Sequence, residues 1–268
     1  MNDSTGLMES DVRAMVRLLG EIAALNGGHE ERKRALMDGL CDLIGADYWV
    51  WGLMTKFESG EPPVYTAMAT GGFDADQFPK LLVAYEHPDL GHLTGPLADE
   101  IAKTGTQITR RREDFDPHDI FPQSGASALF LNANVDVPLL TLRPIQNGCV
   151  SGIGFYRKFG AERFTLREAQ IAHIILSEVH WLHEQGWPWS SAKQLPSLPL
   201  RCRLVLNLLL EGLSRKQVAD QMEISVHTVS GYVKQVYEYF RVNSHAELIT
   251  KFRCGDGGHS RAVESAGL

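Results

Sequence analysis

The first 185 residues alternate between apolar patterns of helical period and of strand period. Apolar side chains recur every three or four residues over residues 12–22 and 36–44, which predicts two amphipathic helices. The recurring residues of the first helix are Val12, Met15, Val16, Leu19 and Ile22. Residues 48–54 and 63–70 are aromatic and β-branched runs, the second closed by Gly71 and Gly72, and they predict a pair of strands.

The rest of this region continues with mixed elements. Residues 76–85 and 93–103 have the pattern of two short surface helices. Residues 135–142 and 150–156 read as two longer strands, and Asn147 and Gly148 between them tolerate the positive φ of a hairpin turn. Thr165 and Glu168 then form a capping-box pattern that starts a helix running to about residue 184.

This order of elements predicts an α+β domain in which an antiparallel sheet is flanked by helices. The segment at residues 151–160, followed by the helix of residues 164–181, resembles GAF-type domains, and the first half of the region is similar to them in element order. The resemblance implies a GAF/PAS-like sensor or dimerisation domain over residues 1–185.

A change in composition marks the end of this domain. Helical periodicity stops at residues 186–197, where Pro, Gly and Ser accumulate, and this segment is interpreted as a linker. Trp187 and Trp189 are unusual in a flexible tether, so we expect the linker to pack against a domain. Residues 198–254 are predicted to form a second domain, and residues 255–268 a flexible tail.

The second domain has the pattern of four short helices. Leu200, Leu204, Val205, Leu208 and Leu209 form one apolar stripe, which ends at a glycine suited to a helix C-terminus, Gly212. The three later helices are each preceded by a capping serine, at Ser214, Ser225 and Ser244, and two of these have Gln or Glu three residues on. The apolar residues assigned to the inner faces of these helices are Val218, Ala219, Met222, Val229, Val233, Val236, Phe240, Leu248, Ile249 and Phe252.

Only three residues separate the second and third helices, so the two must cross steeply and share one small core. The third helix then presents an outer face of polar or small residues, which suit base edges and phosphates in a major groove. The residues of this face are Thr228, Ser230, Gly231, Lys234, Gln235 and Glu238. Arg215, Lys216 and His227 lie at or near helix N-termini, where phosphate oxygens also meet free backbone N–H groups.

Residues 195–253 resemble the LuxR-type helix-turn-helix family. The matching motifs are Glu-Gly-Leu-Ser-Arg-Lys-Gln-Val-Ala at residues 211–219, Ile-Ser-Val-His-Thr-Val at 224–229 and Arg-Val-Asn-Ser-His-Ala-Glu at 241–247. The resemblance implies a scaffold helix at residues 215–222, a DNA recognition helix at 227–239 and a dimerisation helix at 244–252. We therefore expect Arg215, Lys216, His227, Thr228, Ser230, Gly231, Lys234 and Gln235 to bind DNA.

The chain departs from the family pattern at several positions. Cys202 replaces an acidic residue that the family has in the first helix, and Glu223 stands in the turn where glycine is frequent, so a positive φ there would strain the backbone. Gly231 interrupts the recognition helix, and close backbone approach to DNA would justify it. Glu238 and Tyr239 replace basic residues, which lowers the expected phosphate affinity of each protomer.

Charge is divided unevenly along the chain. The whole sequence has a formal net charge of −7, but residues 191–268 hold ten Lys and Arg against seven Asp and Glu. A basic C-terminal region attached to an acidic N-terminal region fits DNA binding, because contact with phosphates depends on local charge. The polar, acidic first ten residues and the lack of a long apolar run predict a cytoplasmic protein without a membrane partner.

The N-terminal domain shows no recognisable catalytic or metal-binding spacing, so we predict no enzyme activity and no cofactor. The candidates weighed for metal binding are His87, Asp89 and His92 in a loop and His173, His180 and His183 on one helix. Arg110, Arg111 and Arg112 form a basic triplet that neighbouring acids are expected to neutralise. Core packing, with a ligand pocket as the alternative, is the prediction for the aromatic residues Tyr48, Trp49, Trp51, Tyr65, Phe155 and Tyr156.

The four cysteines, Cys41, Cys149, Cys202 and Cys254, show no disulfide or zinc spacing and are expected to be reduced and mostly buried. No phosphoacceptor pattern precedes the second domain, which disfavours control by a phosphorelay. The prediction is a homodimeric transcriptional regulator on double-stranded DNA, with a small-molecule ligand and RNA polymerase as further candidate partners. Two alternatives stay open: an adaptor whose helix-turn-helix binds protein, and an enzyme with an appended DNA-binding domain, which a redox-active Cys41/Cys149 pair would support.

Overall fold

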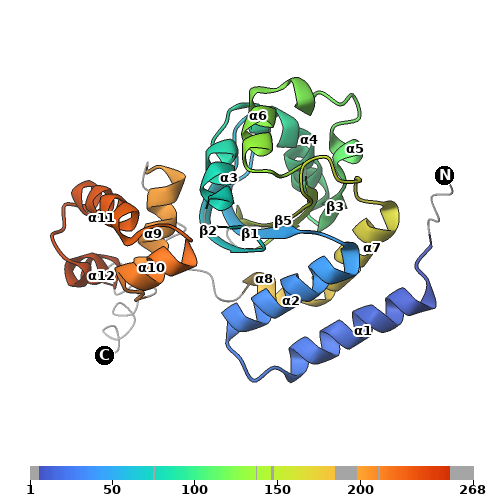
Figure 1. Ribbon diagram of the computed structural model, residues 1–268, viewed down its shortest axis with the longest axis horizontal. Helices are drawn as coiled ribbons and strands as arrows, with labels where there is room; N and C mark the ends of the chain where they lie inside the picture. The colour runs from blue at the N-terminus through green and yellow to red at the C-terminus, as the bar shows by residue number, and fades with distance from the viewer. Residues whose placement is uncertain are drawn as a thin grey trace, which may run out of the picture. The chain divides into compact units, whose positions relative to one another are not determined.

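The computed structural model describes residues 6–74, 76–136, 138–145, 148–184, 198–210 and 212–253 (Figure 1). The chain divides into two compact units, residues 1–187 and 188–268, here called the N-terminal and C-terminal domains. The predicted linker at residues 186–197, Trp187, Trp189, Cys254 and the tail at 255–268 lie outside the described residues.

The N-terminal domain is built on one five-stranded antiparallel sheet with strand order β2-β1-β5-β4-β3. The strands are β1 (Tyr48–Lys56), β2 (Val64–Gly71), β3 (Ile108–Arg110), β4 (Leu139–Pro144) and β5 (Val150–Tyr156). The predicted pair β1/β2 and the predicted hairpin β4/β5 are confirmed, with Pro144 opposite Val150 and Gly148 at φ +73°. Sequence periodicity missed β3, since three residues are too few to show a period.

Helices cover both faces of this sheet, which confirms the predicted α+β architecture (Figure 1). One face carries α1 (Glu9–Ala24), α2 (His29–Ile44), α7 (Leu166–Glu178) and α8 (His180–Glu184). The other carries α3 (Gln77–Tyr85), α4 (Asp89–Thr104), α5 (Arg112–Phe115), the 3₁₀ turn η1 (Phe121–Gln123) and α6 (Gly125–Asn132).

Strand β1 shows how the sequence divides its aromatic residues between these two faces. Successive side chains of a strand point to opposite sides. Trp49 donates a hydrogen bond to Asp38 of α2 (2.7 Å), and Trp51 packs against His183 of α8. Tyr48 points the other way, where its ring stacks on Phe73 and its hydroxyl accepts a hydrogen bond from Gln77 of α3.

The helices over the second face are more buried than the predicted surface helices. α3 buries Phe78, Leu81, Leu82 and Tyr85, and α4 starts four residues earlier than predicted and buries Leu90, Leu97 and Ile101. α4 can approach the β1–β2 loop because it carries glycine at position 91, where a Cβ atom would lie 2.4 Å from the Glu61 carbonyl carbon. The sequence prediction failed here because each helix buries one side against tyrosines and leucines of distant strands.

The structure confirms the first predicted helix as α1 and divides the helix predicted from Thr165 to about residue 184 in two. The apolar stripe of α1 is split: Met15 and Ile22 are buried, whereas Val12 and Val16 are 45% and 65% exposed. The Thr165/Glu168 capping box is confirmed, but the helix that it starts ends at Glu178, and α8 begins at His180 after a residue with non-helical φ and ψ. The three histidines of this region therefore do not share one helix face.

A chain of buried hydrogen bonds ties α7 and α8 to the sheet. The Trp51 indole N–H donates to Ser151 Oγ (2.8 Å), and Ser151 Oγ lies 2.8 Å from His183 Nδ1. His183 Nε2 lies 3.0 Å from the Leu176 carbonyl oxygen. A carbonyl oxygen only accepts, so Nε2 carries the hydrogen and Nδ1 accepts from the Ser151 hydroxyl. These hydrogen bonds fit the neutral imidazole that burial of His183 favours.

Acid should weaken the N-terminal domain through this histidine. Burial, with Arg143 as the next cause, lowers the pKa of His183 from 6.5 to about 3. Between these values the unfolded chain binds a proton that the folded chain does not, so the free energy of unfolding falls as the pH falls, by up to about 1.4 kcal/mol per pH unit. The free energy of unfolding, measured in urea from pH 7 to pH 5, should show this slope in the wild type. In His183→Gln the slope should be smaller by the contribution of about one proton.

A second histidine, His173, contributes to the pH dependence of both the wild type and His183→Gln, so it does not account for a difference between them. Burial and Arg110 also lower the pKa of His173, with the same sign for stability, and this contribution is present in both proteins. An unchanged pH slope in His183→Gln would contradict the assignment.

The C-terminal domain consists of α9 (Leu200–Leu210), α10 (Arg215–Gln221), α11 (Val226–Phe240) and α12 (His245–Arg253), as predicted. All three serine caps are confirmed. Ser214 and Ser225 accept hydrogen bonds from the backbone N–H groups of Gln217 and Thr228, and Ser244 accepts from Glu247. Gly212 takes φ +92° after α9. The predicted inner residues that are buried are Leu200, Leu204, Val205, Leu208, Leu209, Val218, Ala219, Met222, Val229, Val233, Val236 and Leu248, whereas Phe240 and Ile249 are half-buried.

Candidate functional site

The turn between α10 and α11 sets the direction of the third helix of the C-terminal domain. Val218 and Ala219 of α10 pack with Val229 and Val233 of α11 in a small core. Glu223 has φ +54°, in the left-handed region that favours glycine, so the strain that the sequence made conditional on a positive φ is present. The Ile224 N–H returns to the Ala219 carbonyl (3.0 Å), so this residue's conformation closes α10. The backbone accepts a small strain at Glu223 to hold the two helices at their crossing.

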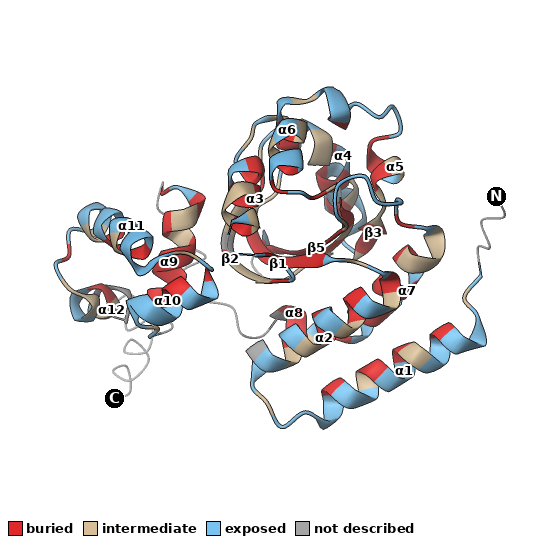
Figure 2. Cartoon of the chain, in the orientation of Figure 1, coloured by how far each residue is buried: buried red, intermediate tan, exposed pale blue. Residues whose placement is uncertain are grey.

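The side of α11 that faces away from this core is exposed (Figure 2). His227, Thr228, Gly231, Lys234 and Glu238 lie there. The Lys234 side chain is 77% exposed, with Nζ 3.8 Å from Glu238 Oε1, one helical turn on. A Cβ atom added at residue 231 would meet no atom within 4 Å, so this glycine leaves the helix backbone open to an approaching molecule.

Two of the predicted site residues have hydrogen-bond partners within the domain, although Ser230 also lines the depression described below. Ser230 donates its hydroxyl to the Val226 carbonyl oxygen (2.9 Å), so its hydrogen is used inside the helix. Gln235 is exposed overall, but its Oε1 accepts a hydrogen bond from the Cys202 thiol of α9 (3.1 Å). The buried Cys202 therefore has a polar partner where the family resemblance implied a missing ion pair, and Gln235 lies at the edge of the exposed face.

A shallow, open depression of about 590 Å³ flanks the exposed face of α11. It is bordered by Arg215 at the start of α10, by Lys234 and Glu238, and by Arg241 after α11. Three cationic groups against one carboxylate make it a favourable place for a phosphate oxygen. Sequence reasoning did not single out Arg241. Its φ of +54° closes α11 in the left-handed conformation, and no simple sequence pattern predicts that for arginine.

The N-terminal domain holds two neighbouring pockets that have three lining residues in common. The inner chamber, of about 50 Å³, lies between the sheet and helices α3 to α6, and the outer chamber, of about 520 Å³, lies between α4 and the segment from α5 to η1. Of the predicted aromatic cluster, Tyr65 and Tyr156 line the inner chamber. The four other members, Tyr48, Trp49, Trp51 and Phe155, are core residues. The sequence analysis missed the aromatic residues that α3, α5, η1 and α6 add to the wall: Tyr85, Phe115, Phe121 and Phe130.

The other candidate clusters resolve into structural contacts. Arg110 pairs with Glu100, Arg111 with Glu113 and Asp114, and Arg112 with three aspartates, so the predicted neutralisation of the triplet is confirmed. His173 bonds to Thr109, His183 is buried in the chain described above, and His180 is exposed. In the described part of the chain, no group of three His, Cys, Asp or Glu side chains is placed to hold a metal ion.

Cys41, Cys149 and Cys202 are buried thiols, and Cys254 lies outside the described residues. Burial raises the pKa of the Cys41 and Cys149 thiols, which keeps both protonated and weakly nucleophilic. Among the described helices, none is long and apolar enough to cross a membrane.

Comparison with known proteins assigns the C-terminal domain. Residues 196–252 match the family of bacterial regulatory proteins called the luxR family. No curated protein matches the chain. A crystal structure of Escherichia coli SdiA aligns at 12% identity over 91% of this chain and 96% of that chain, with a TM-score of 0.39. A structure of SdiA in complex with octanoyl-rac-glycerol aligns at 11% identity over 93% and 96%, with a TM-score of 0.37. At these values the likeness to SdiA assigns neither ligand nor activity.

The family match covers the four helices, the three serine caps and the exposed face of α11 described above. Residues 196–252 of this chain are a helix-turn-helix domain of the luxR family of bacterial regulatory proteins.

Proposed function

We propose that the protein is a cytoplasmic, sequence-specific DNA-binding regulator of transcription, with α11 as the helix that enters the major groove. The observation that carries this proposal is the exposed face of α11 beside the cationic depression of Arg215, Lys234 and Arg241. A helix of this kind reads base edges with short polar side chains while flanking cations neutralise phosphates.

The individual roles follow from where each side chain lies. Thr228, Gly231 and Lys234 face outward and are assigned to the bases, and Gln235 and Ser230 contribute from the edges of that face. Arg215, Lys216 and His227 are exposed in the first turns of α10 and α11, where free backbone N–H groups also favour phosphate. Arg241 joins this phosphate-binding set because it borders the same depression.

Capture of genomic DNA fragments by the full chain tests this function. The expected result is an enriched set of sites with two-fold related half-sites about ten base pairs apart, absent for the double variant Lys234→Ala/Gln235→Ala. Binding should fall steeply as salt is raised, because it releases counterions from phosphates. Capture without enrichment, or binding indifferent to salt, would favour the adaptor alternative.

The exposed stripe of α1 supports a homodimer. Met8, Val12 and Val16 recur at one-turn spacing and stay exposed while the opposite side of α1 packs on α2 and α7 (Figure 2). A second copy of the chain that covers this stripe would pair two recognition helices, which a two-fold operator needs about 34 Å apart. By family resemblance α12 is a second dimerisation element, and RNA polymerase is a further candidate partner of the DNA-bound regulator.

The double variant Val12→Asp/Val16→Asp should dissociate this dimer, since two desolvated carboxylates per protomer are costly in an apolar interface. Light scattering should then change from the mass of two chains to that of one, 29.8 kDa. Val83→Asp, at an equally exposed apolar position on α3, is the matched control and should leave the mass unchanged. A wild-type monomer at every concentration, or a double variant that stays dimeric, would overturn this assignment.

The N-terminal cavity supports control by a small molecule. A chamber of about 520 Å³ has the size of a drug-like ligand site, and its walls come from α4 and the α5–η1 segment of the N-terminal domain. A ligand that changes this packing would alter how the two domains are presented to DNA.

A further inference from the structure

One flank of α11 lies beside α9, and hydrogen bonds between side chains join the two helices there (Figure 1). Arg201 donates to the Tyr232 hydroxyl (3.1 Å), and the Cys202 thiol donates to Oε1 of Gln235 (3.1 Å). Cys202 is fully buried, whereas Gln235 is exposed. The Gln235 side chain therefore reaches from the core of the domain to its surface.

The hydrogen bond to Cys202 fixes which end of the Gln235 amide faces inward. The carbonyl oxygen is a strong acceptor for the thiol, whereas the amino group would have only the sulfur to donate to, and sulfur accepts weakly. The carbonyl oxygen therefore points to Cys202. The Nε2 amino group has no hydrogen-bond partner among the described residues. Held in this way, Gln235 presents two N–H donors outward and turns its acceptor inward.

The helix surface beside this amino group is open. Side chains of an α-helix lean toward its N-terminus, so the Gln235 side chain covers the turn that contains Gly231. A Cβ atom added at Gly231 would meet no atom within 4 Å. Thr228, one turn nearer the start of α11, is also exposed. A base edge can therefore approach the helix backbone at Gly231 and reach the Gln235 amino group.

The bases differ in what they offer to such a group. In the major groove adenine shows the acceptor N7 beside the donor N6, and a glutamine pairs with both when its carbonyl and amino groups are free. Guanine shows two acceptors, N7 and O6, which suit a side chain that only donates. With its carbonyl held by Cys202, Gln235 matches guanine, whereas it would meet the adenine N6 amino group donor against donor.

We propose that Cys202 is a positioning residue for DNA recognition: its thiol holds the carbonyl of Gln235 inward, so that Gln235 selects guanine over adenine in the major groove. The inference rests on the DNA-binding function proposed above and specifies the base that one residue reads. Cys202 acts through Gln235 alone, because it is buried behind that side chain.

Selection of bound duplexes from a random-sequence library by the full chain tests the base assignment. The base position that loses its preference in Gln235→Ala is the one that Gln235 reads. We expect a G·C pair there in the wild type, favoured over A·T by at least about fivefold in affinity. An A·T pair at this position overturns the proposal. So does a Gln235→Ala variant that weakens all sites equally, as loss of a phosphate contact would.

Two variants of Cys202 test the positioning role. Cys202→Ala removes the thiol donor and frees the carbonyl, so the preference for G·C at this position should fall by about threefold to tenfold. Cys202→Ser keeps a donor at the same place and should retain the preference. The proposal is contradicted if Cys202→Ala leaves the preference unchanged, or if Cys202→Ser loses as much of it as Cys202→Ala does.

Two further variants separate positioning from packing. Val205→Ala removes buried apolar volume from the same helix and no hydrogen bond, so it should lower the melting temperature and leave the base preference unchanged. Gln235→Lys, at an exposed position, places a group there that only donates, so its preference for G·C should persist and should not depend on Cys202. A Gln235→Lys/Cys202→Ala double variant that loses this preference would show that Cys202 acts by packing, which contradicts the proposal.

The same library separates this proposal from the proposed function. If the wild type enriches no sequence, the DNA-binding function fails and the base assignment fails with it. If the wild type enriches sites whose base preferences are indifferent to Gln235→Ala and Cys202→Ala, the DNA-binding function stands and this inference alone is overturned.

Discussion

Replacing Lys234 by alanine should lower the affinity of the full chain for its captured DNA sites by about fivefold to 150-fold, equivalent to the free energy of about 1–3 kcal/mol that one base or phosphate interaction supplies. Lys234 is exposed on the outer face of α11. Its described ion-pair partner, Glu238, is also exposed. The pair is therefore weak in solution and is easily exchanged for DNA. Electrophoretic mobility shifts or fluorescence anisotropy over a range of salt concentrations measure the effect.

The salt dependence distinguishes a lysine that binds phosphate from one that binds a base. If Lys234 neutralises a phosphate, its replacement should reduce the slope of log affinity against log salt by about 0.9 for each protomer, whereas a base-reading lysine affects sequence preference more than the slope. Lys103→Ala, an exposed lysine in the last turn of α4, is the matched control and should leave the affinity unchanged. Equal affinities for Lys234→Ala and wild type would remove α11 from the DNA interface.

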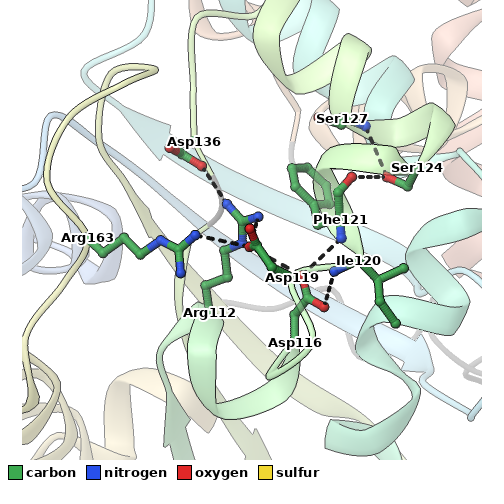
Figure 3. Close-up of polar contacts among 9 residues, drawn as sticks. All are labelled: Arg112, Asp116, Asp119, Ile120, Phe121, Ser124, Ser127, Asp136 and Arg163. Carbon is green, nitrogen blue, oxygen red and sulfur yellow. Dashed lines mark hydrogen bonds and ion pairs between the residues drawn. The ribbon is translucent and has the colours of Figure 1, made fainter.

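Arg112→Ala should destabilise the N-terminal domain by about 3 kcal/mol, because it removes a buried cation that faces the buried Asp116 and two partly exposed aspartates. The Arg112 guanidinium lies 2.6 Å from Asp119, 3.3 Å from Asp136 and 3.7 Å from the buried Asp116, and it packs over the Phe121 ring (Figure 3). Without Arg112, Asp116 stays buried beside Asp119 with no charge to balance it. Urea unfolding followed by tryptophan fluorescence measures the destabilisation, since four of the five tryptophans lie in the N-terminal domain.

Arg163→Ala provides the control for this prediction. Arg163 pairs with the same Asp119 at 3.0 Å, but its side chain is 51% exposed, so its removal should cost less than about 1 kcal/mol. If the two variants lose the same free energy of unfolding, burial of Arg112 does not explain how much its ion pairs stabilise the domain.

The C-terminal domain was predictable because its signals are local. A capping serine and its partner lie three residues apart, and an apolar helix face repeats every turn, so Ser214, Ser225 and the buried residues of α11 were identified without knowledge of the fold. The turn at Glu223 was also identified, since the family pattern marks the position and the structure gives φ +54°. The hydrogen bond between Gln235 and Cys202 was not, because it joins residues 33 positions apart.

Most helices and strands of the N-terminal domain were predictable, but which side of each one is buried was less so. The β1/β2 and β4/β5 pairings were read from alternating residues and turn signals, whereas β3 and α5 to α6 are too short for a period to appear. Apolar spacing also could not say which side of α1 is covered, and Val12 and Val16 proved exposed. The aromatic cluster was named, but only Tyr65 and Tyr156 of its members face the cavity.

The sequence by itself determined the helix-turn-helix of this protein, its caps and its outward polar face, because hydrogen bonds and apolar contacts within a few residues specify them. Only the tertiary structure decided that Arg241 joins Lys234 and Ser230 at one depression, that Gln235 accepts a hydrogen bond from Cys202, and that a tyrosine-lined pocket forms between the sheet and helices α3 to α6. These features bring together side chains from separate helices and strands, and their positions depend on how whole elements pack, which no local pattern encodes.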